Sequence, residues 1–270
     1  MAGPGRTAAF PVIDTVIDEE HRVPDRPEPL TVDDGSEDVE RILIVTAHPD
    51  DVDFAASGSV ATWTGRGIEV AYCIVTDGDA GGSDHSITRA EMAAVRREEQ
   101  VAAARAVGVT DVTFLGFPDG RVTASLELRA AISRVIRMVR PLRVVCQSPE
   151  RNWERIYASH PDHLAAGEAA ACAVYPDARN PFAFPELLAE GLKEHTVPEM
   201  WIMATERANR VVDATDVYDR KLAALMSHKS QVGDGGHLDE LLRNWMGGTA
   251  LAAGLPEGRL AESFHVVNTA

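Results

Sequence analysis

The sequence predicts a Rossmann-like, three-layer α/β fold with a mostly parallel central sheet and helices on both faces. Two observations predict this class. Short apolar runs rich in β-branched residues recur along the chain, and segments with helical spacing of apolar residues separate them. Strands that alternate with helices form parallel sheets whose two faces the helices cover. The chain has 270 residues, which is enough for one such domain.

The predicted strands are short and mostly apolar. The first, ILIVTA at residues 42–47, has no charged residue, which is typical of a buried parallel strand. Further strands are expected at 70–76, 112–115, 143–147, 200–204 and 210–212.

The predicted helices fall between these strands. The clearest begins at Thr88, where Thr88 and Glu91 form a capping box, and ends at Gly108. Other helices are expected at 54–66, 125–140, 163–175, 215–228 and 238–253.

Acidic residues are concentrated near the N-terminus. The formal net charge is −16, and residues 1–40, with eleven acids and three Arg, contribute −8 of it. Such a composition is typical of a solvated tail. We therefore expect an acidic, flexible N-terminal extension over 1–40 and a single α/β domain over 41–270. The acidic surface argues against nucleic acid as a partner.

The chain shows no signal for export or membrane insertion. It has no run of about 18 apolar residues, so no membrane partner is expected. The N-terminus has early acids and no sustained apolar core, unlike a secretory signal. Cys73, Cys146 and Cys172 are far apart in apolar stretches and fit buried free thiols. These observations favour a cytoplasmic protein.

Polar, metal-competent side chains follow the first predicted strand. The sequence there is His48-Pro49-Asp50-Asp51. A dinucleotide-binding domain would place a G-x-G-x-x-G motif at this point, and the motif is absent. Pro49 stiffens the loop, which suits residues that hold an ion. Taken alone, these residues also fit a turn before a helix, since Asp is common at helix N-termini.

A second cluster, His160-Pro161-Asp162-His163, follows the predicted strand at 143–147. The carboxyl ends of parallel strands share one edge of the sheet, where ligands bind, so we expect the two clusters to meet there. Structural zinc usually takes four ligands rich in Cys, and no Cys lies near either cluster. An open site with three protein ligands fits better and predicts a catalytic metal.

The two motifs AHPDD (47–51) and HPDH (160–163) together resemble the LmbE-like, or PIG-L, family of zinc-dependent N-acetylglucosaminyl deacetylases. Further stretches that agree are REEQVAAARAVGV (97–109), FLGFPDG (114–120) and KLAALMSHKSQ (221–231). The resemblance covers residues 41 to 265. The pair of motifs in this order is specific, whereas either alone is weak.

The resemblance implies that His48, Asp51 and His163 bind the metal. Zinc is expected, although iron(II) and other divalent ions tolerate this ligand set. Asp50 would be the general base acting on water activated by the metal. The implied reaction is hydrolysis of an N-acyl amino sugar or a related small N-acyl amine, and the resemblance suggests a homo-oligomer.

The resemblance also implies roles for residues outside the ligand set. His160 would stabilise the oxyanion or protonate the leaving amine, and Asp162 would orient and charge-balance His160. Arg96, in the R-x-x-E of RREE (96–99), and Asp119, in FPDG, would contact the substrate. His228 suits either a helix end, where the dipole favours a cation, or the active site.

The sequence departs from the family at one position of the first motif. Relatives often read AHPDDE, but Val52 stands at the Glu position and Asp53 follows it. Val52 cannot form a side-chain hydrogen bond, so the role of that Glu is lost or passes to Asp53. The ligands are intact, but the substrate is put in doubt.

Three other functions are compatible with parts of this pattern. A metal-dependent hydratase could use the same fold to add water to an unsaturated acid. An iron oxygenase uses the same ligand types, although the alternating strand and helix pattern argues against it. A non-catalytic binding protein would be expected to lack a ligand or the base, and both are present.

Overall fold

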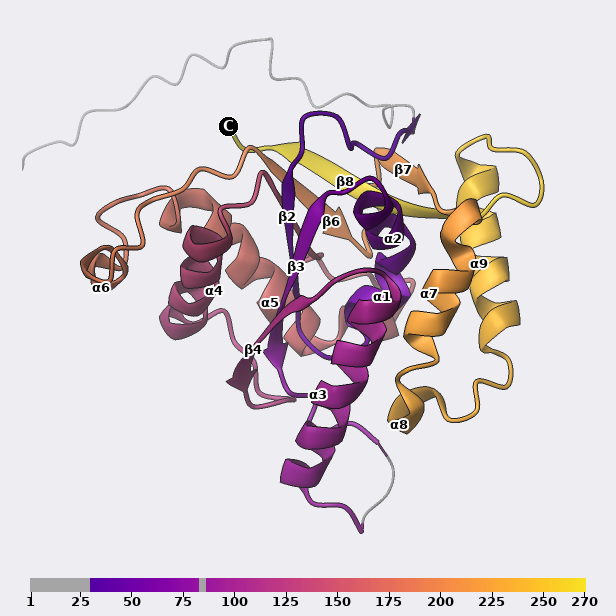
Figure 1. The fold of residues 1–270 in the computed structure, drawn as a ribbon, viewed down its shortest axis with the longest axis horizontal. Coiled ribbons are helices and arrows are strands. Elements are labelled where there is room, and N and C mark those ends of the chain that lie inside the picture. Colours follow the sequence, from indigo (N-terminus) through magenta and orange to yellow (C-terminus); the bar gives the residue numbers. More distant parts are fainter. Residues whose placement is uncertain (1–29, 83–85) are drawn as a thin grey trace, which may run out of the picture.

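The computed structural model describes residues 30–82 and 86–270, which form one eight-stranded sheet with helices on both faces (Figure 1). The strands are β1 (Thr31–Val32), β2 (Arg41–Thr46), β3 (Glu69–Thr76), β4 (Asp111–Phe117), β5 (Arg143–Gln147), β6 (Glu199–Met203), β7 (Arg210–Asp213) and β8 (Ala261–Asn268).

The strand order is β1-β7-β8-β6-β5-β2-β3-β4. All neighbouring pairs of described strands are parallel except the two that β8 makes with β6 and β7. The chain runs from β2 to β3 and β4 on one side, then returns to β5 and β6 on the other. β2 and β5 therefore flank a topological switch point, where sheets of this type bind ligands. The predicted mostly parallel sheet is confirmed.

Helices cover both faces of the sheet. They are α1 (Asp51–Ala55), α2 (Ser57–Gly65), α3 (Arg89–Ala106), α4 (Leu126–Val139), α5 (Pro161–Cys172), α6 (Pro185–Ala189), α7 (Tyr218–Leu225), α8 (Lys229–Val232) and α9 (Leu238–Ala252). Figure 1 shows α4 and α5 on one face, and α2, α3 and α7 on the other. Among the described helices, none is long and apolar enough to cross a membrane.

Side chains of β2 alternate between two apolar layers, as expected for a strand buried on both faces. Ile42 packs in a cluster with Trp63 of α2. Leu43, its neighbour, packs in a second cluster with Leu128 of α4. All four side chains are fully buried, so the sheet is held between two cores and its carboxyl edge is a rigid base for the site.

Most predicted elements are found, with shifted ends. The predicted strand at 143–147 is β5, and the capping box at Thr88 starts α3 as expected. The predicted helix at 54–66 is split into α1 and α2 at Ala56, whose φ is −143°. β1 and β8 were not predicted. In β8 the pattern is obscured by Glu262, a buried charged residue.

Residues 30–40, which fall within the expected extension, contact the sheet. β1 pairs with β7. The indole Nε1 of Trp63 donates to the carbonyl of Asp34 at 2.7 Å, and Arg143 Nη2 donates to the carbonyl of Gly35 at 2.6 Å. The remainder of the expected extension, residues 1–29, lies outside the described residues.

A buried ion pair links α7 to β8 and explains the break between α1 and α2. Lys221 Nζ lies 2.8 Å from Glu262 Oε1, and both side chains are buried. Lys221 also donates to the carbonyls of Asp53 at 2.7 Å and Phe54 at 2.8 Å, where α1 ends. Glu262 accepts from the backbone N–H of Ser59 at 2.7 Å near the start of α2. Lys221 therefore donates to backbone carbonyls at the end of α1, and Glu262 accepts from a backbone N–H near the start of α2.

Lys221→Met is expected to lower the free energy of unfolding by about 3–5 kcal/mol, because it leaves the Glu262 carboxylate buried without its cation. Chemical denaturation measures this change. Arg134→Met, which breaks an exposed pair with Glu190, is the matched control and should change stability little. Equal effects of the two substitutions would contradict the account of the buried pair.

Candidate active site

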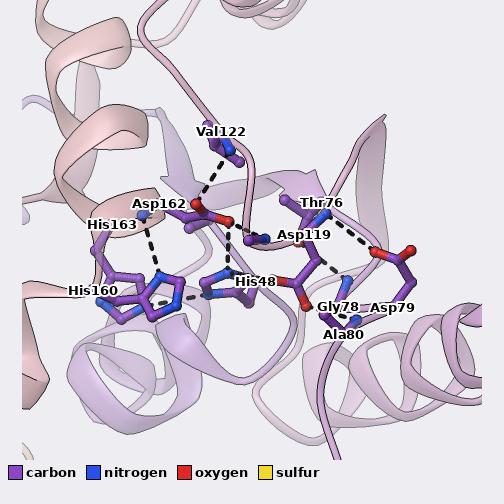
Figure 2. Close-up of polar contacts among 12 residues, drawn as sticks. His48, Thr76, Gly78, Asp79, Ala80, Asp119, Val122, His160, Asp162 and His163 are labelled. Atoms are coloured by element: carbon purple, nitrogen blue, oxygen red, sulfur yellow. Dashed lines mark hydrogen bonds and ion pairs between the residues drawn. The ribbon is translucent and has the colours of Figure 1, made fainter.

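The two predicted clusters meet at the carboxyl edge of the sheet (Figure 2). Residues 48–51 follow β2 and lead into α1, while residues 160–163 lead into α5 after the long loop that leaves β5. β2 and β5 are hydrogen-bonded neighbours. The site therefore lies at the switch point of the sheet.

Three side chains converge on one point. His48 Nδ1 lies 3.2 Å from His163 Nε2 and 3.3 Å from the Asp51 carboxylate. His163 Nε2 lies 3.0 Å from the same carboxylate. Ligands at about 2.0–2.1 Å from a tetrahedral zinc ion lie about 3.3–3.4 Å from one another. Asp51 faces His48 with Oδ2 and His163 with Oδ1, so the carboxylate as a whole forms the third corner of what we call the ligand triangle. Its three contacts are close to the spacing of ligands around a divalent ion.

The other ring nitrogen of His48 contacts two carboxylates. Nε2 lies 3.1 Å from Asp119 Oδ1 and 3.3 Å from Asp162 Oδ2. Asp162 also accepts from the backbone N–H groups of Gly120 at 2.7 Å and Val122 at 3.2 Å. An N–H donated to a carboxylate fixes the imidazole tautomer and leaves the opposite nitrogen available to a metal.

Two other groups of donors also come close together. One is His48, His160 and His163, and the other is His48, Asp119 and Asp162. In the second group, the carboxylates of Asp119 and Asp162 already accept hydrogen bonds from backbone N–H groups. We favour the triangle that includes Asp51 because its atoms lie at ligand spacing and its Asp supplies a negative charge.

The charges around His48 favour a cation at this place. Burial lowers the pKa of His48, but the charge of Asp51 and hydrogen bonds to Asp119, Asp162 and Asp51 outweigh it and raise the pKa to about 12. Burial raises the pKa of Asp51, yet His163 and His48 hold it well below its usual range. Asp119 behaves in the same way, with burial opposed by His48 and a pKa of about 2.

Asp50 has an unusual backbone conformation. Its φ of 89° is in the left-handed region, which a residue with a Cβ adopts only at a cost. Its N–H donates to Gln100 Oε1 at 2.8 Å. Arg96 Nη2 donates to Asp50 Oδ2 at 3.0 Å and to the carbonyl of Pro49 at 2.6 Å. Arg96 and Gln100 lie four residues apart on one face of α3, so this helix holds the Asp50 loop at two points.

Burial, followed by the charge of Asp51, raises the pKa of Asp50 to about 7, although Arg96 opposes this shift. A carboxylate with a pKa near neutrality is suited to general base catalysis.

His160 lies beside the triangle. Its ring centroid is 5.0 Å from that of His48 and 5.3 Å from that of His163. Its Nδ1 accepts from the backbone N–H of Asp162 at 3.2 Å at the start of α5. Burial and the charges of His48 and His163 lower the pKa of His160. A neutral ring whose Nδ1 accepts carries its hydrogen on Nε2, which is then a donor.

The contacts of three residues, Asp162, Arg96 and Asp119, differ from those expected. The Asp162 carboxylate contacts His48 and the loop after β4. The hydrogen bond between Asp162 and His160 comes from the backbone N–H of Asp162 and not from its carboxylate. Arg96 is only 4% exposed and holds protein groups of the Asp50 loop and Gly78. Asp119 is 7% exposed and contacts His48 and the N–H of Ala80. These three residues therefore contact the protein groups that form the site and hold them in place.

A cavity of about 450 Å³ opens beside Asp51 and His163. Its apolar wall comes mainly from α1 and α9 and includes Phe54, Leu242, Trp245 and Met246. Its polar groups include Gln147, Asn152, Arg155, Thr205 and Glu206. The Arg155 guanidinium lies over the Trp245 ring at 4.8 Å. Sequence reasoning missed the contribution of α9, because its residues are far from both motifs in the chain and form no motif of their own.

The departure at Val52 has a structural counterpart. Val52 is fully buried in the apolar cluster of β2 and α2. Asp53 is also fully buried, and its carboxylate receives hydrogen bonds from Gln100 and His228. Asp53 therefore carries the polar contacts next to the motif.

The fold and site define a class of α/β protein with a His/Asp/His cluster, suited to a metal, at the switch point of a mostly parallel sheet. The family model described as PIG-L, GlcNAc-PI de-N-acetylase, matches residues 43–174. The diacetylchitobiose deacetylase of Thermococcus kodakarensis is 35% identical over 198 residues, which cover 72% of this chain and 71% of that protein. The chain belongs to the PIG-L, or LmbE-like, deacetylase family, as its two motifs predicted.

Other relatives agree with this membership. A probable N-acetyl-alpha-D-glucosaminyl L-malate deacetylase 2 of Bacillus cereus is 30% identical over 199 residues, covering 70% of this chain and 83% of that protein. The structure of N,N'-diacetylchitobiose deacetylase from Pyrococcus horikoshii superposes with a TM-score of 0.79 at 29% identity, covering 86% of this chain and 85% of that one. A 4-carboxy-2-hydroxymuconate hydratase from Pseudomonas putida shares the fold, with a TM-score of 0.70 at 23% identity and coverage of 84% and 96%.

Proposed function

We propose that this protein hydrolyses the amide of an N-acylated amino sugar, with a divalent metal held by His48 Nδ1, Asp51 and His163 Nε2. The observation that carries this proposal is the ligand triangle of His48, Asp51 and His163, whose contacts measure 3.0–3.3 Å, beside a cavity of about 450 Å³. Membership of a deacetylase family supports the reaction, and relatives named for N-acetylated sugars support the substrate class. Zinc is the first candidate, and iron(II) accepts the same donors.

A metal held there would polarise the amide carbonyl and make water more acidic, which is the chemistry that such ions supply in hydrolases. Asp50 takes a proton from the attacking water as the water oxygen bonds to the carbonyl carbon. The N–H of His160 Nε2 donates to the oxygen on which negative charge develops. When the carbon–nitrogen bond breaks, the proton that Asp50 took from the water moves to the leaving nitrogen. The products are a carboxylate and a free amine.

The cavity fits a sugar-sized substrate. Its volume lies within the range of about 300–1,000 Å³ for small-molecule sites. Trp245 offers a flat apolar face, and Gln147, Asn152 and Thr205 offer hydrogen-bonding groups for hydroxyls. A combination of aromatic and polar walls is suited to a ring with both apolar faces and hydroxyl edges.

The test is amine release from a panel of N-acylated amino sugars by zinc-loaded wild type and Asp50→Ala. Turnover by wild type that is abolished in Asp50→Ala supports the proposal. If metal binds but no sugar on the panel releases an amine or acetate, the proposal fails. Water addition to unsaturated acids would then be the reaction to assay.

A further inference from the structure

A buried His–Asp pair lies behind the Asp50 loop. His228, which precedes α8, places Nε2 at 2.8 Å from Asp53 Oδ2 on α1. Both residues are fully buried. Within the described residues, His228 Nδ1 and Asp53 Oδ1 lack hydrogen-bond partners. Leaving buried polar atoms unpaired lowers the free energy of unfolding. If these two residues served only to fill space, apolar residues of similar size would stabilise the fold more.

Gln100 connects this pair to the backbone of Asp50. Its Nε2 donates to Asp53 Oδ2 at 2.9 Å, and its Oε1 accepts from the N–H of Asp50 at 2.8 Å. Gln100 is fully buried on α3, so its amide has little freedom to turn. The carboxylate of Asp53 decides which end of this amide faces Asp50, because only the NH₂ end can donate to it. The oxygen is therefore presented to the Asp50 N–H.

The end of this hydrogen-bond chain coincides with the strained residue of the site. The left-handed φ of 89° at Asp50 needs support from its surroundings. Arg96 holds the carbonyl of Pro49 and the side chain of Asp50 from the same helix. Only Gln100 satisfies the N–H of Asp50 among the hydrogen bonds of the described residues.

We propose that His228 is a positioning residue, which acts through Asp53 and Gln100 to hold the backbone of Asp50 and so aim its carboxylate. The inference rests on the proposed function, since that function makes Asp50 the base. His228 does not line the cavity, and its positioning effect passes through three hydrogen bonds. Its charge also acts on Asp50: burial raises the pKa of that carboxylate, and His228 lowers it. Small displacements of a catalytic group cost up to about 100-fold in rate.

The experiment compares His228→Leu, which removes the donor, with His228→Gln, whose amide nitrogen can donate from nearly the same place as Nε2. We expect His228→Leu to lower kcat by about 10- to 100-fold, because a small misplacement of a catalytic group costs up to about 100-fold in rate. KM should stay near the wild-type value, because substrate contacts are unchanged. His228→Gln should recover most of kcat.

A second readout does not need turnover. Hydrogen–deuterium exchange of the Asp50 amide, followed by NMR, reports whether Gln100 still protects it. We expect faster exchange in His228→Leu and near-wild-type exchange in His228→Gln. The matched control is His195→Leu, because His195 Nε2 binds the carbonyl of Pro141 at 2.7 Å at the opposite end of β5. It should change neither kcat nor Asp50 exchange.

Unchanged Asp50 exchange in His228→Leu, or a loss of kcat that His228→Gln fails to recover, would overturn the inference. If His228→Leu does not fold, Gln100→Met removes the same link from α3 and should give the same fall in kcat and faster exchange. Inactivity of the wild type on every sugar would refute the proposed function alone. Faster exchange in His228→Leu would still support the hydrogen-bond chain in that case.

Discussion

Asp50→Asn is expected to lower kcat by about 10²–10⁴-fold, the usual contribution of general acid–base catalysis, while the metal content stays at the wild-type level. Asparagine has nearly the same shape, and its oxygen can still accept from Arg96. It cannot take a proton from water. Steady-state kinetics with metal analysis of the same samples separates the loss of the base from a loss of metal.

Asp216→Asn is the matched control for this substitution, because its side chain is 88% exposed and its ion pair with Arg259, at 3.7 Å, is long. It should behave as wild type. Near-full activity of Asp50→Asn with metal bound would show that another group accepts the proton. His160 would then be the next residue to test.

His163→Ala should abolish tight metal binding and, with it, activity. Removing a residue that only orients a ligand costs about 10–100-fold in metal affinity, so losing a direct ligand should cost more than about 100-fold. Competition with a chelator measures the affinity, and metal analysis after dialysis measures the stoichiometry. Asp162→Asn, which alters the carboxylate behind His48, should fall within the smaller range.

His195→Ala is the control for the loss of an imidazole, because the Nε2 of His195 contacts the carbonyl of Pro141, at the opposite end of β5 from the site. Full metal stoichiometry and wild-type affinity in His163→Ala would refute the proposed ligand set. The neighbouring group of His48, Asp119 and Asp162 would then have to hold the ion.

The sequence predicted those features that depend on residues close together in the chain. Apolar runs predicted the strands of the central sheet, and two short motifs predicted which loops meet at its edge. Residues 48–51 and 160–163 could be placed together because β2 and β5 had to be parallel strands of one sheet. The residues of one motif lie close together because they are neighbours in the chain. The parallel sheet brings the two motifs together because both follow the carboxyl ends of strands.

The sequence was less informative about contacts between distant segments. Arg96 matched a substrate-binding position, but its guanidinium turns inward to the Asp50 loop. The Asp162 carboxylate turns to His48 because the N–H groups of Gly120 and Val122 hold it there. The antiparallel β8 was missed because its inward-facing Glu262 is satisfied by Lys221, 41 residues away. The residues around Glu262 in the sequence do not indicate that Lys221 is its partner.

The position of the cavity wall along the chain has a consequence for how this enzyme can change. The three ligand candidates and Asp50 all lie within residues 43–174, the part that the family model matches. Most of the cavity lining, including Trp245 and Met246, comes from residues 204–263. Mutations at lining positions such as Trp245 and Met246 can therefore reshape what the cavity accepts while the ligand candidates and Asp50 stay unchanged. Lys221 and His228 lie in the same segment but do not share this freedom, because their contacts support the fold and the Asp50 loop.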